Sequence, residues 1–133
     1  MTMQRVLLAD DHPEFLGVVA RHLQPHFDVV RTVDNGQAMV DEAARLEPDV
    51  VVLDISMPVL NGIEAARKLK ATGSRAKIVF LTVHADQDYV RAALRAGAVG
   101  YVLKSELASD LLPCLRQADV ASPFVSPALA WGS

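Results

Sequence analysis

The sequence predicts one α/β domain in which a parallel β-sheet is covered by helices on both faces. Two observations predict this class: short apolar runs free of charge recur along the chain, and segments with helical spacing of apolar residues lie between them. A short apolar run is typical of a strand that helices cover on both sides. Strand and helix alternate five times, which leads to right-handed βαβ units. The length of 133 residues fits a single core.

Four strands are expected where the apolar runs are strongest. They cover residues 6–9, 50–53, 78–81 and 99–103, and most are rich in β-branched residues. A weaker candidate for a fifth strand covers residues 27–32.

Five helices are expected to follow these strands. Apolar residues recur at helical spacing within residues 15–23, 39–44, 63–69, 90–94 and 111–115. Asn-Gly pairs and single glycines mark some of the boundaries. The pairs are Asn35-Gly36 before the second helix and Asn61-Gly62 before the third, and the glycines are Gly73 and Gly97 after the third and fourth.

The composition excludes several classes of protein. With 51% hydrophobic and 22% charged residues the chain is expected to fold, and its 13 basic and 16 acidic residues leave a net charge of −3, without the basic excess that nucleic-acid binding needs. Cys114 is the single cysteine and cannot form an internal disulfide. No Cys/His cluster has the spacing of a zinc site, and no apolar run approaches the length of a membrane span. We expect a soluble cytoplasmic protein.

Polar residues follow the expected strands where ligands bind in open parallel sheets. Asp10 and Asp11 follow the first strand, Asp54 the third, Thr82 the fourth and Lys104 the last. A Gly-rich phosphate loop does not follow the first strand, and two carboxylates stand in its place. Carboxylates at one edge repel each other unless a cation intervenes, and Mg²⁺ is typically held by one or two of them together with water and a phosphoryl group.

Asp54 is the best candidate for a nucleophile in such a site. A carboxylate beside a metal and a lysine can accept a phosphoryl group and form an acyl phosphate. Lys104 and the hydroxyl of Thr82 would then contact the phosphoryl oxygens. Read singly, each residue has a more ordinary explanation: Asp10 or Asp11 could cap a helix near Pro13 in a solvated turn, and Lys104 could be a surface lysine.

The residues around this site resemble a response regulator receiver domain, and in particular the NarL/FixJ (LuxR-type) subfamily. The stretches that carry the resemblance are LADDHP at 8–13, LDISMP at 53–58 with NG at 61–62, LT at 81–82 and GAVGYVLKS at 97–105. The match covers about residues 4–118. It implies a flavodoxin-like three-layer sandwich with a five-stranded parallel sheet of order 2-1-3-4-5 and five helices.

The resemblance also implies roles for individual residues and for partners. Mg²⁺ would be the cofactor, and a sensor histidine kinase would phosphorylate the chain. Phosphorylation would switch the helix 4/strand 5/helix 5 face, and the chain would form a homodimer. The chain would act as a switch rather than an enzyme, with only its own phosphorylation and dephosphorylation. The implied roles are phosphoacceptor for Asp54, direct metal ligand for Asp11, water-mediated metal ligand for Asp10, backbone-carbonyl metal ligand for Ser56, phosphoryl contacts for Thr82 and Lys104, and a rotamer switch that follows Thr82 for Tyr101.

Two other functions stay open at this point. A metal-dependent aspartyl-phosphate phosphatase would need a second acid two residues after Asp54, where Ser56 stands. A pseudo-receiver would bind partners without phosphorylation, although nothing in the sequence requires it.

The four histidines are interpreted as solvent-facing or loop residues. His22 and His26 have the spacing of a helical metal pair, but Pro25 lies between them and they are expected to face solvent. His12 and His84 have no partner at the spacing of a metal pair, and each is expected in a loop. His84, two residues after Thr82, could affect how water reaches an acyl phosphate.

The C-terminal part departs from the pattern. Pro113 falls inside the last expected helix, residues 107–118, so the helix either starts late with Ser109 as N-cap or starts near Ser105 and bends. Residues 1–118 are interpreted as the receiver and 119–133 as a linker-like tail. The chain would be a fragment of a regulator with a helix-turn-helix output domain, or a single-domain receiver.

Overall fold

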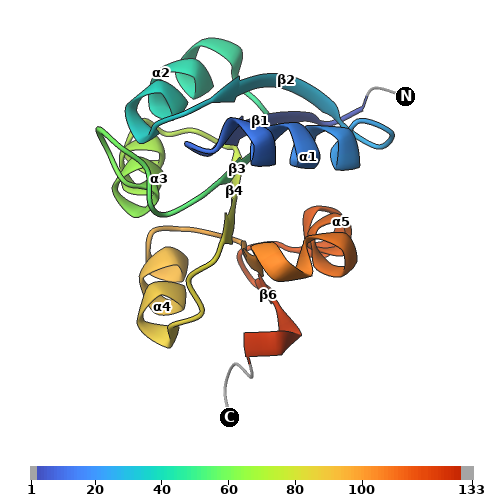
Figure 1. Ribbon diagram of the computed structural model, residues 1–133. Helices are drawn as coiled ribbons and strands as arrows, with labels where there is room; N and C mark the ends of the chain where they lie inside the picture. Colours follow the sequence, from blue (N-terminus) through green and yellow to red (C-terminus); the bar gives the residue numbers. More distant parts are fainter. Residues whose placement is uncertain (1–2, 130–133) are drawn as a thin grey trace.

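Six parallel strands form one sheet in the computed structural model, which describes residues 3–129 (Figure 1). Their order is β2-β1-β3-β4-β5-β6, so the expected order of the first five strands and the fold class are confirmed. The expected number of five strands is wrong, because a short strand from the C-terminal tail adds to the β5 edge. The strands are β1 (Arg5–Ala9), β2 (Asp28–Val33), β3 (Val50–Leu53), β4 (Lys77–Thr82), β5 (Gly100–Leu103) and β6 (Phe124–Val125).

Five α-helices cover the sheet in two layers, with α1 and α5 on one face and α2, α3 and α4 on the other (Figure 1). Each layer buries its own hydrophobic cluster against alternate residues of the strands. Within residues 3–129, no helix combines the length and apolar character needed to cross a membrane. The helices are α1 (Pro13–Leu23), α2 (Gly36–Leu46), α3 (Gly62–Ala71), α4 (Gln87–Arg95) and α5 (Leu107–Gln117).

The predicted helix boundaries at Asn and Gly residues are confirmed by capping contacts. The side chain of Asn35 accepts a hydrogen bond from the backbone N–H of Ala38, and Asn61 does the same for Glu64. Gly73 and Gly97 follow α3 and α4 with φ angles of 82° and 101°, in the left-handed region that glycine adopts without strain.

Helix α1 begins differently from the solvated-turn interpretation. Its N-cap is His12, whose side chain makes no capping hydrogen bond, and Pro13 occupies the first turn. Asp10 is 4% exposed and accepts a hydrogen bond from the backbone N–H of His12. The interpretation of Asp10 as a solvated side chain is therefore wrong.

The last helix keeps Pro113 in its interior. A 3₁₀ turn, η1 (Lys104–Glu106), leads directly into α5, so the late start at Ser109 is not adopted. The buried apolar face of α5, which includes Leu111 and Leu115, packs in the cluster shared with α1. This packing holds the helix together across the proline, which lacks an N–H to donate.

Part of the segment expected as a linker packs against the sheet. After α5, residues 124–125 form β6, and a 3₁₀ turn, η2 (Pro127–Leu129), follows. Ser126 is completely buried and Leu129 is 8% exposed. Residues 130–133 of the expected tail lie outside the described residues.

Candidate functional site

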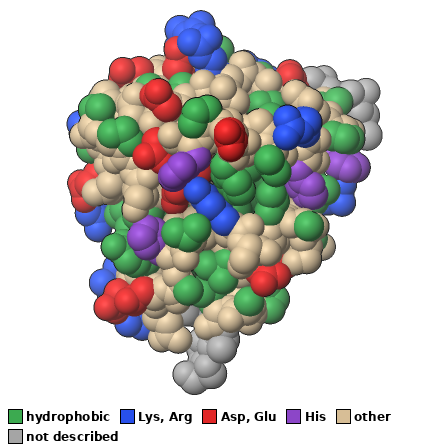
Figure 2. Space-filling view, in the orientation of Figure 1, with side chains coloured by type: hydrophobic (Ala, Val, Ile, Leu, Met, Phe, Trp, Pro, Cys, Tyr) green, Lys and Arg blue, Asp and Glu red, His purple; other side chains and the backbone are tan. Residues whose placement is uncertain are grey.

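The polar residues that follow the strands converge at one edge of the sheet. Ala9 pairs with Leu53, and Leu53 with Phe80, so the parallel register brings the ends of β1 and β3 to the same level. Asp10 and Asp54 follow directly. Strand β4 continues two residues further, to Thr82. Figure 2 shows acidic, basic and histidine side chains gathered in the middle of this face, next to hydrophobic side chains.

Lys104 links the two buried carboxylates. Its Nζ lies 2.8 Å from Oδ2 of Asp10 and 2.9 Å from Oδ2 of Asp54. It also lies 4.5 Å from the centre of the Phe15 ring, a cation–π contact. Burial by itself would lower the pKa of Lys104, but hydrogen bonds to Asp10 and Asp54 and the charges of both outweigh it and raise the pKa. The lysine is therefore held as a cation between the carboxylates.

The carboxylate of Asp54 is fixed on both oxygens. Oδ1 accepts a hydrogen bond from the backbone N–H of Ile55 at 2.7 Å, while Oδ2 faces Lys104. Gly62, the first residue of α3, packs so closely on the Asp54 carbonyl that a Cβ atom would collide with it. The glycine of the Asn61-Gly62 pair is therefore needed for this close approach as well as for the start of the helix.

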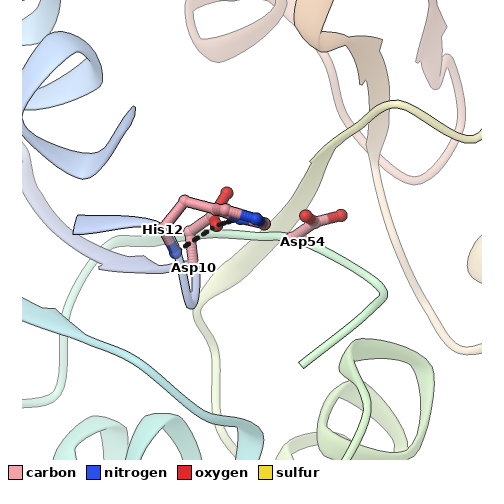
Figure 3. Close-up of side chains that lie close together, drawn as sticks. All are labelled: Asp10, His12 and Asp54. Atoms are coloured by element: carbon pink, nitrogen blue, oxygen red, sulfur yellow. Dashed lines mark hydrogen bonds and ion pairs between the residues drawn. The ribbon is translucent and has the colours of Figure 1, made fainter. Parts of the chain in front are cut away.

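His12 lies over the Asp10 carboxylate (Figure 3). Its Nδ1 lies 2.9 Å from Oδ1 of Asp10 and 3.0 Å from Oδ1 of Asp11, although the imidazole is largely exposed. His12 lies between β1 and α1, the loop position expected for it, and from there contacts both carboxylates. The contact could not be predicted from the sequence, because it depends on the turn after β1, which brings the imidazole ring back over Asp10.

The donor atoms at this edge fit a hard cation. Ligand atoms of Asp10, His12 and Asp54 lie within 4.8 Å of one another. Asp11 and Ser56 line an adjoining open depression. Carboxylate oxygens are the ligands that Mg²⁺ and other hard cations prefer, so the acidic part of the set matches the sequence expectation.

Thr82 and Tyr101 meet at the loop after β4. The hydroxyl of Thr82 accepts a hydrogen bond from the backbone N–H of His84 at 3.3 Å, and the hydroxyl of Tyr101 donates one to the His84 carbonyl at 2.6 Å. Both side chains are fully buried. Burial, followed by the charge of Asp54, raises the pKa of Tyr101, so its hydroxyl remains a donor.

The side chain of His84 also has partners that the sequence did not predict. Its Nε2 lies 2.8 Å from Oγ of Ser56, and its ring lies 4.5 Å from that of Tyr89, centre to centre. His84 and Ser56 come from the loops after β4 and β3, so their contact spans the neighbouring strands next to Asp54.

The other two histidines lie at the far end of α1. His26 is exposed and accepts a hydrogen bond from Arg116 of α5 at 3.2 Å. His22 is half-buried, and among the described residues its buried Nε2 has no hydrogen-bond partner. The expectation that both face solvent is therefore wrong for His22.

The comparisons with known proteins place these features in one family. The family model described as the response regulator receiver domain matches residues 6–116. The chain is 34% identical over 125 residues to the transcriptional regulatory protein DegU of Brevibacillus brevis, with 92% of the chain and 53% of DegU covered. It is 36% identical over 126 residues to the nitrate/nitrite response regulator NarL of Escherichia coli K12, with 93% and 58% covered. The chain thus spans a little more than half the length of these relatives.

Solved structures agree with these relatives. A two-component response regulator of the LuxR family from Aurantimonas sp. SI85-9A1 superposes with a TM-score of 0.88 at 30% identity, covering 97% of this chain and 94% of that one. The non-phosphorylated receiver domain of the stress response regulator RcsB from Escherichia coli gives a TM-score of 0.82 at 26% identity, with 93% and 98% covered.

Proposed function

Because the chain belongs to the family of response regulator receiver domains, we propose that one phosphoryl group, transferred to Asp54, switches it between two states. The observation that carries this proposal is the ion cluster in which Lys104 contacts both Asp10 and Asp54. Such a cluster holds a carboxylate next to a fixed positive charge, which is the arrangement that a phosphoryl acceptor needs.

The transfer is a displacement at phosphorus. An Oδ atom of Asp54 forms a bond to the phosphorus, and the bond from phosphorus to the donor's nitrogen or oxygen breaks. The donor leaves with that electron pair and takes up a proton. Lys104 is positioned to contact a phosphoryl oxygen, because its Nζ already lies 2.9 Å from Asp54.

A divalent cation, Mg²⁺ in our proposal, would be held by Asp10, Asp11, Asp54 and the backbone carbonyl of Ser56. When bound, it would neutralise charge on the phosphoryl group during transfer. Asp10 and Asp54 contribute buried oxygen atoms, and Asp11 lies at the exposed side of the same edge. His12 contacts both aspartates and so orients their carboxylates.

Thr82 and Tyr101 would carry the change away from Asp54. The Thr82 hydroxyl would turn to a phosphoryl oxygen, and the loop with His84 would follow, because its N–H is bonded to that hydroxyl. The His84 carbonyl in turn holds Tyr101. The face formed by α4, β5 and α5 is thereby the part of the molecule that responds.

The partners follow from the family. We propose a sensor histidine kinase as phosphoryl donor, in the cytoplasm, and a homodimer as one product of the switch. The names of the relatives DegU and NarL support transcriptional control as the output. With its net charge of −3, the chain lacks the basic excess that DNA binding needs, so we assign DNA contact to an output domain of helix-turn-helix type.

Intact mass measurement after incubation with Mg²⁺ and acetyl phosphate tests the proposal. We expect the wild type to gain one phosphoryl group and Asp54→Asn to gain none. Asp49→Asn is a matched control at the opposite end of the β3 strand and should gain the group as the wild type does. An equal gain in Asp54→Asn, or none in the wild type, would contradict the proposal.

A further inference from the structure

The segment after α5 forms the outer edge of the sheet. Strand β6 runs parallel to β5, with Gly100 opposite Phe124 and Tyr101 opposite Val125. The backbone N–H of Phe124 donates to the Val99 carbonyl at 2.8 Å, and that of Ser126 donates to the Tyr101 carbonyl at 2.9 Å. Residues 124–129 are called the docked segment here, and its first three residues pair directly with the strand that carries Tyr101.

A buried serine fastens the docked segment to two elements. The Ser126 hydroxyl accepts a hydrogen bond from the backbone N–H of Leu103 at 3.1 Å and donates one to Oδ2 of Asp110 at 2.7 Å. Ser109 donates to the other oxygen of Asp110. If the segment left, Oδ2 of the buried Asp110 carboxylate and the N–H of Leu103 would both lose their partner, which is unfavourable.

The same segment packs around Tyr101. Val125 lies beside Tyr101 on the neighbouring strand, and Leu129 belongs to the same hydrophobic cluster as the tyrosine ring. Tyr101 has no exposed surface, and its hydroxyl is held by the His84 carbonyl. The contacts that keep the Tyr101 ring buried are thus also the contacts that hold the docked segment on the sheet.

We propose that the docked segment is a conformational latch coupled to Tyr101, so that a phosphoryl group on Asp54 tightens its docking on β5. This inference rests on the proposed function. A phosphoryl group that fixes Thr82 also fixes the loop of His84, and with it the acceptor of the Tyr101 hydroxyl. The Tyr101 ring, held inside the hydrophobic cluster, then presents a stable surface to Val125 and Leu129.

Coupling of this kind is reciprocal. If a phosphoryl mimic bound at Asp54 stabilises the docked segment, then loosening the segment must weaken the binding of that mimic by the same factor. The latch therefore provides a route from Asp54 to the docked segment at residues 124–129.

Hydrogen exchange at the amides of Phe124 and Ser126 measures the docking directly. Beryllofluoride is a mimic of the phosphoryl group. We expect beryllofluoride with Mg²⁺ to slow exchange at both amides about tenfold in the wild type, because the coupling between two sites typically changes an affinity by about 5- to 150-fold. Exchange at the central Val52 amide reports whether the whole domain has changed. In Tyr101→Phe, which keeps the ring but removes the hydroxyl, the slowing should be much smaller.

The reciprocal measurement is the affinity for beryllofluoride. Ser126→Ala should weaken it several-fold, whereas Ser122→Ala, at an exposed serine of the same tail, should leave it unchanged. Val125→Ala removes packing on Tyr101 without removing a backbone hydrogen bond. It should also weaken the affinity for beryllofluoride.

The two proposals fail in different ways. If beryllofluoride binds with wild-type affinity in Ser126→Ala and Val125→Ala, or leaves the Phe124 and Ser126 amides unchanged, the latch is overturned and the proposed function stands. If beryllofluoride does not bind to the wild type, the proposed function is overturned together with the latch.

Discussion

The ammonium group of Lys104 lies 2.9 Å from the carboxylate of Asp54, and the two side chains are 12% and 4% exposed, respectively. Because Asp10 shares the same ammonium group, one lysine compensates two buried carboxylates. Burial makes each unpaired charge expensive, so this contact organises the site and contributes to stability.

Replacing Lys104 by methionine should destabilise the fold. Two carboxylates would be left near each other without a cation, and breaking a buried pair in this way typically costs about 3 kcal/mol or more. Denaturant unfolding at neutral pH measures the loss. Lys68→Met, at an exposed position on α3, should change the free energy of unfolding little; an equal effect of both substitutions would contradict the role of Lys104.

Mutation of Gly62 to alanine should also destabilise the fold, by about 2 to 3 kcal/mol, because the new Cβ collides with the Asp54 carbonyl. Gly17→Ala provides a matched control within α1, where a Cβ meets only Arg21 at 3.4 Å. That substitution should stabilise by about 0.5 to 1 kcal/mol, since alanine favours helix. Thermal unfolding measures the change in stability of each variant. A change of the same sign in both variants would contradict the close approach of Gly62 to the Asp54 carbonyl.

Alkaline pH should destabilise the fold in part through Cys114. Burial, followed by the charge of Asp110, raises the pKa of its thiol from 9.0 to about 12. A raised pKa in the folded state favours the neutral thiol, so this contribution is complete below pH 9.0 and is lost as the pH rises toward about 12.

Cys114→Ala isolates this contribution. The substitution lowers stability by a cavity effect that does not depend on pH, while its free energy of unfolding should fall less steeply above pH 9.0 than that of the wild type. Denaturant unfolding across this range measures both slopes, and parallel curves would refute the assignment to Cys114.

Loss of the His84 side chain should shorten the life of the phosphorylated state. The contact of His84 with Ser56 spans the loops beside Asp54. There it would restrict the approach of water to the acyl phosphate that we propose on Asp54. We expect His84→Ala and Ser56→Ala each to speed dephosphorylation about fivefold, the equivalent of one hydrogen bond. The double variant should be no faster than either alone, because both remove one contact. An unchanged dephosphorylation rate in His84→Ala would contradict this role of His84.

The fold was predictable where local pattern and tertiary structure agree. The apolar run before Asp54 became β3, and the capping residues Asn35 and Asn61 became helix starts, because a buried strand and an N-cap each leave a local signature. Strand β6 was not predictable in this way. Phe124 and Val125 belong to a stretch of only three residues between Pro123 and Pro127. Their strand exists because the β5 edge offers unpaired carbonyl groups.

For the candidate site, the sequence by itself determined which chemical groups end the strands. The order of Asp10, Asp54, Thr82 and Lys104 along alternating strands and helices requires them to meet at one edge of a parallel sheet. Only the tertiary structure decided which contacts they make. Lys104 spans both carboxylates, and His84 holds Tyr101 through its backbone carbonyl. A backbone acceptor leaves no trace in the residue type, and the distances between residues on different strands depend on register and packing, which no local pattern encodes.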